Sequence, residues 1–223
     1  MFILAIISLV LVFKHYGEGL PNYRQLKEYK PMITTRIYAA DDSLITEFSK
    51  EKRIFIPIHL IPKNVINAFL AAEDSNFYNH FGIDIVAIIR TAMQNLSSSM
   101  SGEDKFGGAS TITQQVVKNF LLTNDRTIER KIKEAILAIR MSRNFSKEQV
   151  LELYLNQIYL GSGSYGVAAA AQSYFDKSIS ELEIEEIAVL ATLPKAPSRL
   201  DPRKNIEKAK IRRDWVISRM VEE

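Results

Sequence analysis

Residues 146–163 read SKEQVLELYLNQIYLGSG, and this stretch indicates the fold class of the chain. Ser146 is followed three residues later by Gln149, a pair that caps the start of a helix through two reciprocal hydrogen bonds. The Gly161–Gly163 turn ends such a helix, because glycine adopts a positive φ at little cost. A capped helix is therefore predicted over Ser146–Tyr159.

Apolar residues recur at helical spacing along most of the chain from Pro62 onward. The other predicted helices are Pro62–Glu73, Ile83–Leu96, Ser110–Leu122, Thr127–Arg143, Tyr165–Tyr174, Glu181–Leu193 and Asn205–Met220. Pro194 and Pro197 end the helix before them, since proline cannot continue a helix. The longest polar, glycine-rich break, Ser97–Gly108, predicts a loop between two helices. These patterns predict a mainly α fold.

Strand-like alternation occurs only before the helices. Residues 34–38 and 44–48 alternate around an Asp41–Ser43 turn, and Arg53–Ile58 alternates again. The pattern predicts a short N-terminal β-hairpin or a three-stranded unit, and no sheet after it.

The composition is that of a globular protein with one main domain that buries a core. The chain has 223 residues, of which 47% are hydrophobic and 25% charged, and its formal net charge is +3. So small a positive excess does not predict a nucleic-acid partner. The absence of cysteine rules out disulfides and thiolate metal sites. The three histidines, His15, His59 and His80, are too far apart in sequence for a zinc-binding pair.

The first residues predict a membrane anchor. Met1–Phe13 is apolar throughout, yet about 13 residues at roughly 1.5 Å each cover only about 20 Å of a hydrocarbon core about 30 Å thick. We interpret this segment as the outer part of a truncated or mis-started anchor, residues 14–33 as a juxtamembrane linker, and residues 34–223 as the main domain. A buried N-terminal helix is the alternative, and the flanking charges indicate no orientation.

Glu73 is the first candidate for chemistry. It ends the predicted helix Pro62–Glu73 and is followed by Phe77, Tyr78 and Phe81. A carboxylate at a helix C-terminus opposes the macrodipole, and an aromatic wall removes water. Both effects are expected to raise the pKa of the Glu73 carboxyl toward that of a general base or acid. The alternative is an ordinary surface acid beside core aromatic residues.

A glycine turn and a helix start form a second candidate site at residues 107–115, GGASTITQQ. A helix N-terminus presents free N–H groups to anionic or hydroxyl-rich ligands, and small side chains allow a close approach. The candidate residues are Ser110, Thr111, Gln114 and Gln115. Plain helix capping explains the same residues equally well.

Charged residues cluster on the predicted helix Thr127–Arg143. Arg130 and Lys131 lie four and three residues before Glu134, so the three side chains share one helical face. Joined by Lys118, the two cations would clamp a diphosphate, which suits guanidinium and ammonium donors. A solvated, salt-bridged face is the usual alternative, and spacing does not separate the two.

Five stretches of the sequence occur in a characteristic order. They are AAEDSNFYNHFGID at 71–84, GGASTITQQVVKNF at 107–120, ERKIKEAILAIR at 129–140, LELYLNQIYLGSGSYGV at 151–167 and AVLATLPKAPS at 188–198. Together they closely resemble the five motifs of the peptidoglycan glycosyltransferase domain of class A penicillin-binding proteins. The resemblance runs from roughly Arg36 to the C-terminus. It implies a lysozyme-like α fold with a head lobe and a membrane-contacting jaw lobe.

The resemblance also implies a reaction. Family members polymerise lipid II with inversion at the outer face of the cytoplasmic membrane and release undecaprenyl diphosphate. Glu73 matches the glutamate that deprotonates the 4-hydroxyl of the acceptor. Glu134, Arg130 and Lys131 match the residues that hold the departing diphosphate, and Lys118 matches a further contact.

Further contacts and partners follow from the same resemblance. Ser110, Thr111, Gln114 and Gln115 would line the donor side, and Asn156, Tyr159 and Gly161–Gly166 would shape the floor of the cleft. No cofactor is required, although family members can use Mg²⁺ or Mn²⁺ at the diphosphate, for which Glu134 would be the carboxylate. The expected partners are lipid II, the growing glycan strand, the outer leaflet of the membrane and other cell-wall synthesis proteins, with moenomycin as inhibitor and no nucleic acid.

Residues 83–90 are apolar on nearly all sides, which an ordinary surface helix would not be. In the family this stretch belongs to the jaw that dips into the bilayer, and a buried core helix is the alternative. The loop Leu96–Phe106 is longer than in the family. Any basic contact of this region, for which Lys105 is a candidate, is therefore not placed.

Two rival functions stay open on the sequence. One is a lytic enzyme of the same fold that cleaves glycan strands with Glu73 as the acid. The other is a non-catalytic, membrane-tethered glycan-binding module. The transpeptidase domain of bifunctional relatives is expected to be absent from residues 1–223.

Overall fold

The computed structural model describes residues 11, 13–29, 35–41, 44–48, 51–101, 109–123, 125 and 127–223. The chain forms two compact units, and each is described by itself. Unit 1 comprises Met1–Glu28 and Asn76–Val150, and unit 2 comprises Tyr29–Ser75 and Leu151–Glu223.

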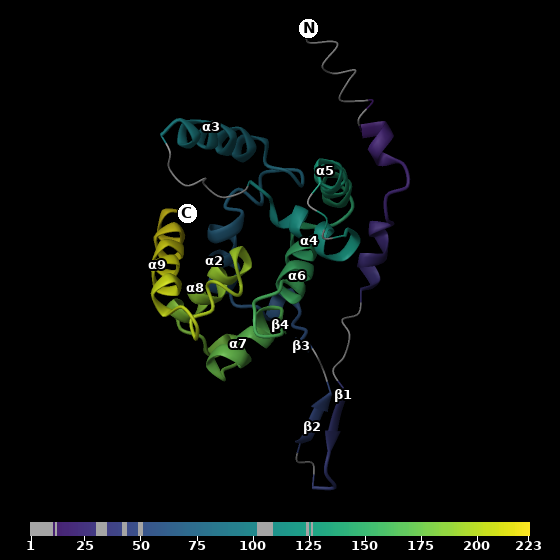
Figure 1. Cartoon of the computed structure of the whole chain (residues 1–223). Helices are drawn as coiled ribbons and strands as arrows, with labels where there is room; N and C mark the ends of the chain where they lie inside the picture. The colour runs from purple at the N-terminus through teal and green to yellow at the C-terminus, as the bar shows by residue number, and fades with distance from the viewer. Residues whose placement is uncertain are drawn as a thin grey trace. The chain divides into compact units, whose positions relative to one another are not determined.

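Helices dominate the described part of the chain and confirm the mainly α prediction (Figure 1). The α-helices are α2 (Lys63–Glu73), α3 (Ile85–Ser101), α4 (Ile112–Leu121), α5 (Ile128–Ser142), α6 (Lys147–Gln157), α7 (Val167–Phe175), α8 (Ile184–Thr192) and α9 (Ile206–Glu222). The 3-10 helices are η1 (Tyr23–Glu28), η2 (Ile58–Leu60), η3 (Ile179–Glu181) and η4 (Leu193–Lys195). The strands are β1 (Thr35–Tyr38), β2 (Leu44–Phe48), β3 (Lys52–Arg53) and β4 (Ser164–Tyr165).

Each predicted helix forms, and its ends differ by a few residues because several predicted ends are caps. Thr127 is the N-cap of α5 and Arg143 its C-cap. At the start of α6, Ser146 and Gln149 exchange both predicted hydrogen bonds, at 2.9 and 3.2 Å. The φ angles are positive from Gly161 to Gly163, as the predicted glycine turn requires.

In unit 1, α4 packs against α5. Side-chain hydrogen bonds hold the loop before α3. Lys147 at the start of α6 donates to the carbonyl oxygens of Phe77 and His80, the latter at 2.7 Å. The Asp84 carboxylate accepts from the backbone N–H of Ala87 at 2.9 Å and so caps α3. The loop therefore has a defined conformation in which its turn approaches α5 closely at Gly82.

The predicted juxtamembrane linker is partly folded onto unit 1. Residues 13–17 are helical, η1 follows, and Leu26 is buried. Arg140 near the end of α5 donates to the carbonyl oxygen of Gly17 at 3.1 Å, and Asn144 donates to the Tyr23 hydroxyl at 3.0 Å. The described lead-in is therefore attached by hydrogen bonds as well as by buried Leu26, and a search for apolar periodicity does not detect such bonds.

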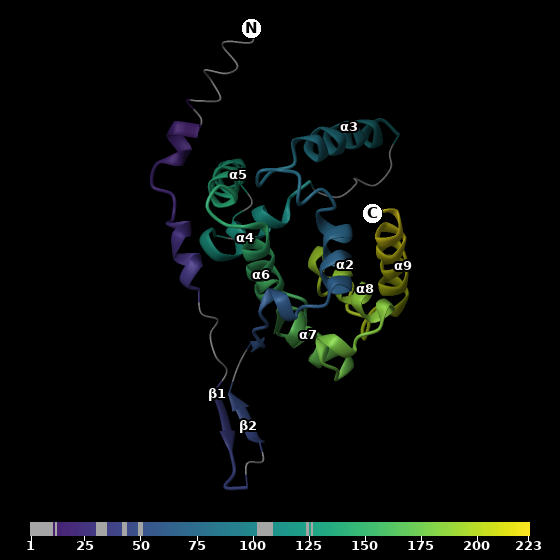
Figure 2. The same cartoon turned by 180° about the vertical axis from the view of Figure 1, so that it is seen from behind.

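In unit 2, α8 packs against both α2 and α9 (Figure 2). The core contains Phe69 of α2 together with Ile187 and Leu190 of α8, all nearly inaccessible to solvent. Helix α9 buries only Ala209 and Val216 among its residues. Most side chains of α9 are therefore available to solvent or to a ligand.

The strand predictions are partly confirmed. β1 and β2 form the predicted antiparallel hairpin, but the third strand predicted over Arg53–Ile58 is wrong. β3 ends at Arg53 and pairs in parallel with β4, so the prediction of no later sheet is wrong too. Beyond β3, the backbone N–H and carbonyl of Ile56 bond to the side chain of Asn156 at 2.8 and 2.9 Å. A side-chain amide thus takes the place of a partner strand.

Two further predictions concern segments of which the structure describes only a part. Helix α3 continues to Ser101, because serine is tolerated within a helix. The loop predicted from Ser97 therefore begins later. Residues 102–108, with Lys105, lie outside the described residues. Of the predicted anchor Met1–Phe13, only residues 11 and 13 are described. Within the described residues, no helix is both long and apolar enough to cross a membrane.

Candidate functional site

The charged residues predicted on α5 form one buried group in unit 1. Glu134 is only 1% exposed. Its Oε2 accepts a hydrogen bond from Arg130 Nη1 at 2.5 Å, and its Oε1 accepts one from Lys131 Nζ. A buried carboxylate is costly unless it is paired with cations. The solvated-face interpretation is therefore wrong for Glu134, and its two cations are held in fixed positions.

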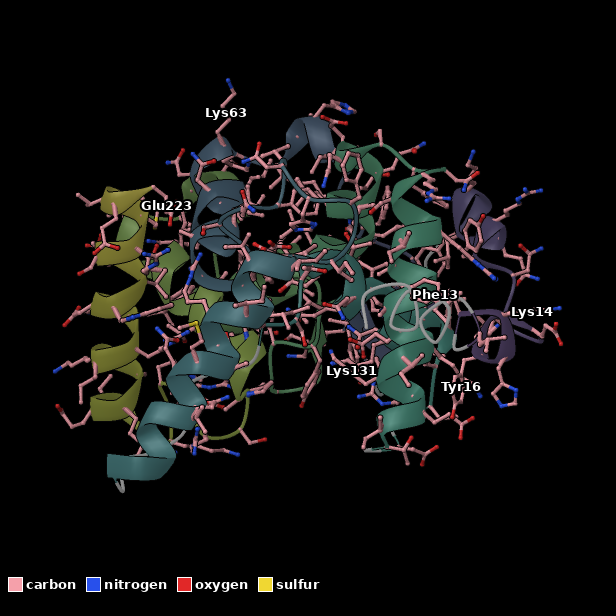
Figure 3. All side chains as sticks on the ribbon, turned by 90° about the horizontal axis from the view of Figure 1, so that it is seen from above. Phe13, Lys14, Tyr16, Lys63, Lys131 and Glu223 are labelled. Atoms are coloured by element: carbon pink, nitrogen blue, oxygen red, sulfur yellow. The ribbon has the colours of Figure 1, made fainter. Side chains whose placement is uncertain are left out.

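Both cations keep donors for a further ligand. The Lys131 side chain, labelled in Figure 3, is 46% exposed. It donates to Ser110 Oγ at 2.7 Å. The Arg130 side chain is 18% exposed. Since arginine has five N–H donors and lysine three, Glu134 uses only part of their capacity. We call Ser110, Arg130, Lys131 and Glu134 the α5 cluster; with two cations and one carboxylate, it can bind an anion.

The predicted ligand-binding residues at the start of α4 divide into two kinds. Thr111 and Gln114 form a capping box in which each side chain bonds the other's backbone N–H, at 3.0 and 3.1 Å. The Thr111 hydroxyl also donates to the Gly82 carbonyl at 2.6 Å, and both side chains are buried. Capping therefore accounts for these two residues. Gln115 and Lys118 are half-buried on the same helix and keep part of their surface toward solvent.

Among the residues that the structure describes, the groups around Glu134 do not fit a metal ion. Both carboxylate oxygens already accept hydrogen bonds from cations. Within the residues that the structure describes, no group of three His, Cys, Asp or Glu side chains lies close enough together to hold a metal ion. We therefore derive no chemical step through Mg²⁺ or Mn²⁺.

Glu73 is the last residue of α2, as predicted, and is half-buried. Asp74 follows it as the C-cap and is 7% exposed. The aromatic residues after them belong to unit 1 and differ from one another, since Phe77 is fully buried and Phe81 is 78% exposed. Within unit 2, the electrostatic surroundings of Glu73 come from other residues.

Three side chains of unit 2 interact electrostatically with Glu73. Burial raises the pKa of Tyr154 well above its ordinary value, and the charges of Glu73 and Asp74 raise it further. Burial and the Arg212 guanidinium lower the pKa of Lys195, and the Glu73 carboxylate opposes this shift. Burial likewise lowers the pKa of Arg212, and the Glu73 carboxylate opposes this shift. The negative charge of Glu73 thus opposes the lowering of the pKa values of Lys195 and Arg212.

Sequence reasoning missed these neighbours of Glu73. Lys195 lies between Pro194 and Pro197 in the quoted stretch AVLATLPKAPS, and this rigid setting was a usable signal. No signal in the sequence indicated Arg212, because the pattern of its helix is that of an ordinary charged surface helix.

The two predicted residues of the fourth motif have different settings in unit 2. The Asn156 amide donates to the carbonyls of Ile56 and Glu152, both at 2.9 Å. Both donor hydrogens are therefore used within the protein, which favours a structural role. Tyr159 is 37% exposed, and its ring lies 4.9 Å from that of Tyr165. Of the two, Tyr159 is the one that keeps a surface for a ligand.

Comparison with known proteins shows the family of the chain. Residues 41–221 match the transglycosylase family. Penicillin-binding protein 1A of Rickettsia felis is 56% identical over 212 residues, which is 95% of this chain and 27% of that protein. The protein of the same name from Aquifex aeolicus is 47% identical over 223 residues, covering 100% of this chain and 30% of that protein. The one from Escherichia coli is 44% identical over 216 residues, covering 97% and 25%.

A crystal structure of penicillin-binding protein 1A from Haemophilus influenzae also aligns with this chain, at 29% identity and a TM-score of 0.45. The alignment covers 86% of this chain and 18% of that one. The chain spans only 25–30% of the length of the three relatives described above.

The fold is mainly helical, and on α5 a buried carboxylate holds two cations side by side. The match over residues 41–221 then identifies the family: the chain belongs to the transglycosylases. Over almost its whole length it is similar to the transglycosylase part of penicillin-binding protein 1A. Family membership also supports the predicted lysozyme-like fold.

Proposed function

We propose that this chain polymerises lipid II into the β-1,4-linked glycan strands of peptidoglycan, with inversion, and releases undecaprenyl diphosphate. Family membership supports glycosyl transfer. The observation that carries the proposal is the α5 cluster, in which buried Glu134 fixes two cations whose remaining donors suit a diphosphate.

The proposed chemistry needs one base and one cationic site. The Glu73 carboxylate accepts the proton of the acceptor 4-hydroxyl, whose oxygen then attacks the anomeric carbon of the donor. The bond from that carbon to the diphosphate breaks, and its electron pair leaves with the diphosphate. Because Arg130 and Lys131 stabilise the departing charge, no second carboxylic acid is needed, unlike in most glycosidases.

We assign the remaining predicted contacts by their surroundings. Lys118, Gln115 and Tyr159 are proposed to touch substrate, since each keeps exposed surface. Thr111 and Asn156, together with Gln114, are proposed to position these elements through hydrogen bonds inside the protein.

The proposed place of action is the outer leaflet of the cytoplasmic membrane, together with other cell-wall synthesis proteins. Large apolar side chains of α3 are exposed, among them Ile85 at 62%, Ile89 at 55% and Met93 at 68%. The buried-core alternative for this helix is therefore wrong. An exposed apolar face of this kind suits contact with a lipid surface.

Polymerisation of purified lipid II tests the proposal. We expect glycan polymer from the wild-type chain and a rate at least about 100-fold lower for Glu73→Gln, since the amide cannot accept the proton. Glu185→Gln, at an exposed position of α8, is the matched control. Full activity of Glu73→Gln would refute the assignment of the base.

Parallel incubation with finished glycan strands separates the two rival functions. Consumption of strands without polymer from lipid II would establish the lytic alternative, and lipid II binding without turnover would establish the binding module.

Moenomycin is expected to raise the melting temperature at high ligand excess. Chelation of divalent cations is expected to leave the polymerisation rate unchanged.

A further inference from the structure

A cavity of about 340 Å³ opens beside α9 in unit 2. It is lined by three cationic residues and three apolar ones, namely Arg199, Lys208, Arg212, Leu200, Ile211 and Trp215. We call it the α9 pocket. None of these residues belongs to the α5 cluster, and none received a role from the sequence.

The cations of the α9 pocket lack the salt bridges that neighbouring cations have. On the same helix, Lys210 pairs with Glu207 and Arg213 pairs with Asp214. Within the described part of the chain, Arg199, Lys208 and Arg212 make no salt bridge, although the charge of Glu73 acts on Arg212. Three cations around one cavity that lacks an acidic residue in its lining suit an anion with more than one negative oxygen.

The apolar wall of the pocket is exposed as well. Ile211 is 72% and Trp215 39% exposed, while Leu200 is buried. The guanidinium carbon of Arg212 lies 3.4 Å from the centre of the Trp215 ring, so the cation is held against the aromatic face. An exposed tryptophan and isoleucine beside cations match the chemistry of the boundary between lipid headgroups and acyl chains.

Electrostatic crowding around the pocket points the same way. Partial burial lowers the pKa of Lys195, and the guanidinium groups of Arg212 and Arg199 lower it further. Glu73 is the acidic group that opposes this shift. A bound anion would therefore add to the effect of Glu73 and reduce the repulsion among these cations.

We propose that the α9 pocket binds the phosphate headgroup of a membrane lipid. The phosphate oxygens accept hydrogen bonds from Arg199, Lys208 and Arg212, and the first part of the hydrocarbon chain lies on Ile211 and Trp215. The inference rests on unit 2 alone and does not require lipid II polymerisation. Loss of one proposal therefore leaves the other intact.

Trp215 is the only tryptophan of the chain, so its fluorescence reports on this pocket directly. The whole chain in a non-ionic detergent is titrated with farnesyl diphosphate and, separately, with inorganic diphosphate. We expect a saturable change in emission with farnesyl diphosphate at a concentration at least about tenfold lower than with inorganic diphosphate. Equal affinities would overturn the role of the apolar wall, and no change in emission would overturn the site.

Vesicles distinguish the sources of the phosphate. A change in emission with phosphatidylglycerol vesicles and none with phosphatidylcholine vesicles assigns the pocket to an anionic glycerophospholipid. A response to farnesyl diphosphate alone assigns it to a prenyl diphosphate. Either result supports the proposed phosphate lipid.

Paired variants test the contribution of the cations. Arg199→Ala combined with Lys208→Ala is expected to weaken binding at least about tenfold. Lys204→Ala combined with Lys210→Ala removes the same charge from exposed positions outside the pocket and is expected to bind as the wild type does. Equal weakening in both pairs would show a general effect of net charge and would overturn the site.

Discussion

At the scale of single residues, two lysines of α5, Lys131 and Lys133, have different partners. Lys131 bonds to buried Glu134 and to Ser110, whereas Lys133, two positions along α5, pairs with exposed Glu129. If the α5 cluster stabilises a leaving diphosphate, Lys131→Ala should lower the polymerisation rate by roughly 100-fold. Lys133→Ala should stay within about twofold of wild type, because exposed ion pairs contribute little.

Initial rates with lipid II and melting temperatures of both lysine variants provide the check. Similar rates for the two variants would mean that the α5 cluster stabilises the fold only.

Asp84 gives a pH dependence at the same scale. Burial raises the pKa of its carboxyl, but hydrogen bonds from the Ala87 N–H and the Asn76 amide outweigh burial, so the pKa falls below its ordinary 3.8. A lowered carboxyl pKa stabilises the folded state fully above about pH 3.8, and this stabilisation is lost as the pH falls through the lower folded value.

Asp84→Ala should therefore lower the free energy of unfolding by about 1 kcal/mol at pH 7. The difference from wild type should shrink below pH 3.8, as the carboxyl becomes protonated. Urea unfolding at a series of pH values measures it. A difference that is constant down to pH 2 would contradict the assigned role of the charge.

At the scale of elements, Gly82 allows the loop before α3 to approach α5. Its φ is +89°, and a Cβ there would collide with the backbone carbonyl of Ala138 and lie 2.8 Å from Ser142 Oγ. Gly19 has a similar φ of +71° but nothing within 4 Å. Gly82→Ala should cost about 3 kcal/mol or more of stability, and Gly19→Ala only about 1 kcal/mol.

Chemical denaturation of the two alanine variants compares these costs. Equal losses would mean that backbone strain alone matters, and that the loop does not depend on close contact with α5.

Helix ends show what local patterns can predict. Ser146 with Gln149 and the Gly161–Gly163 turn were predictable because capping and positive φ depend on residues close in sequence. The pairing of β3 with β4 was not, because the partner strands lie far apart along the chain and each has only two residues. So short a strand has too little alternation to be recognised.

At the scale of the whole molecule, the exposed apolar face of α3 predicts contact with a membrane. The chain has no cysteine, so Met93→Cys introduces a single site for an environment-sensitive fluorophore. Its emission should shift to the blue when vesicles are added, because this position is 68% exposed on an apolar face. A label at Ile184→Cys on α8, 43% exposed, is the control and should respond less. An unchanged label at position 93 would contradict the assignment.

The sequence by itself determined the helices, the candidate base Glu73 and the grouping of Arg130, Lys131 and Glu134, because helical spacing and capping are local properties of the chain. Only the tertiary structure decided that Glu134 is buried, that Thr111 and Asn156 bond within the protein, and that Lys195 and Arg212 interact electrostatically with Glu73. Burial and long-range charge depend on segments brought together by folding. The spacing of residues along the chain therefore does not reveal burial or long-range electrostatic interactions.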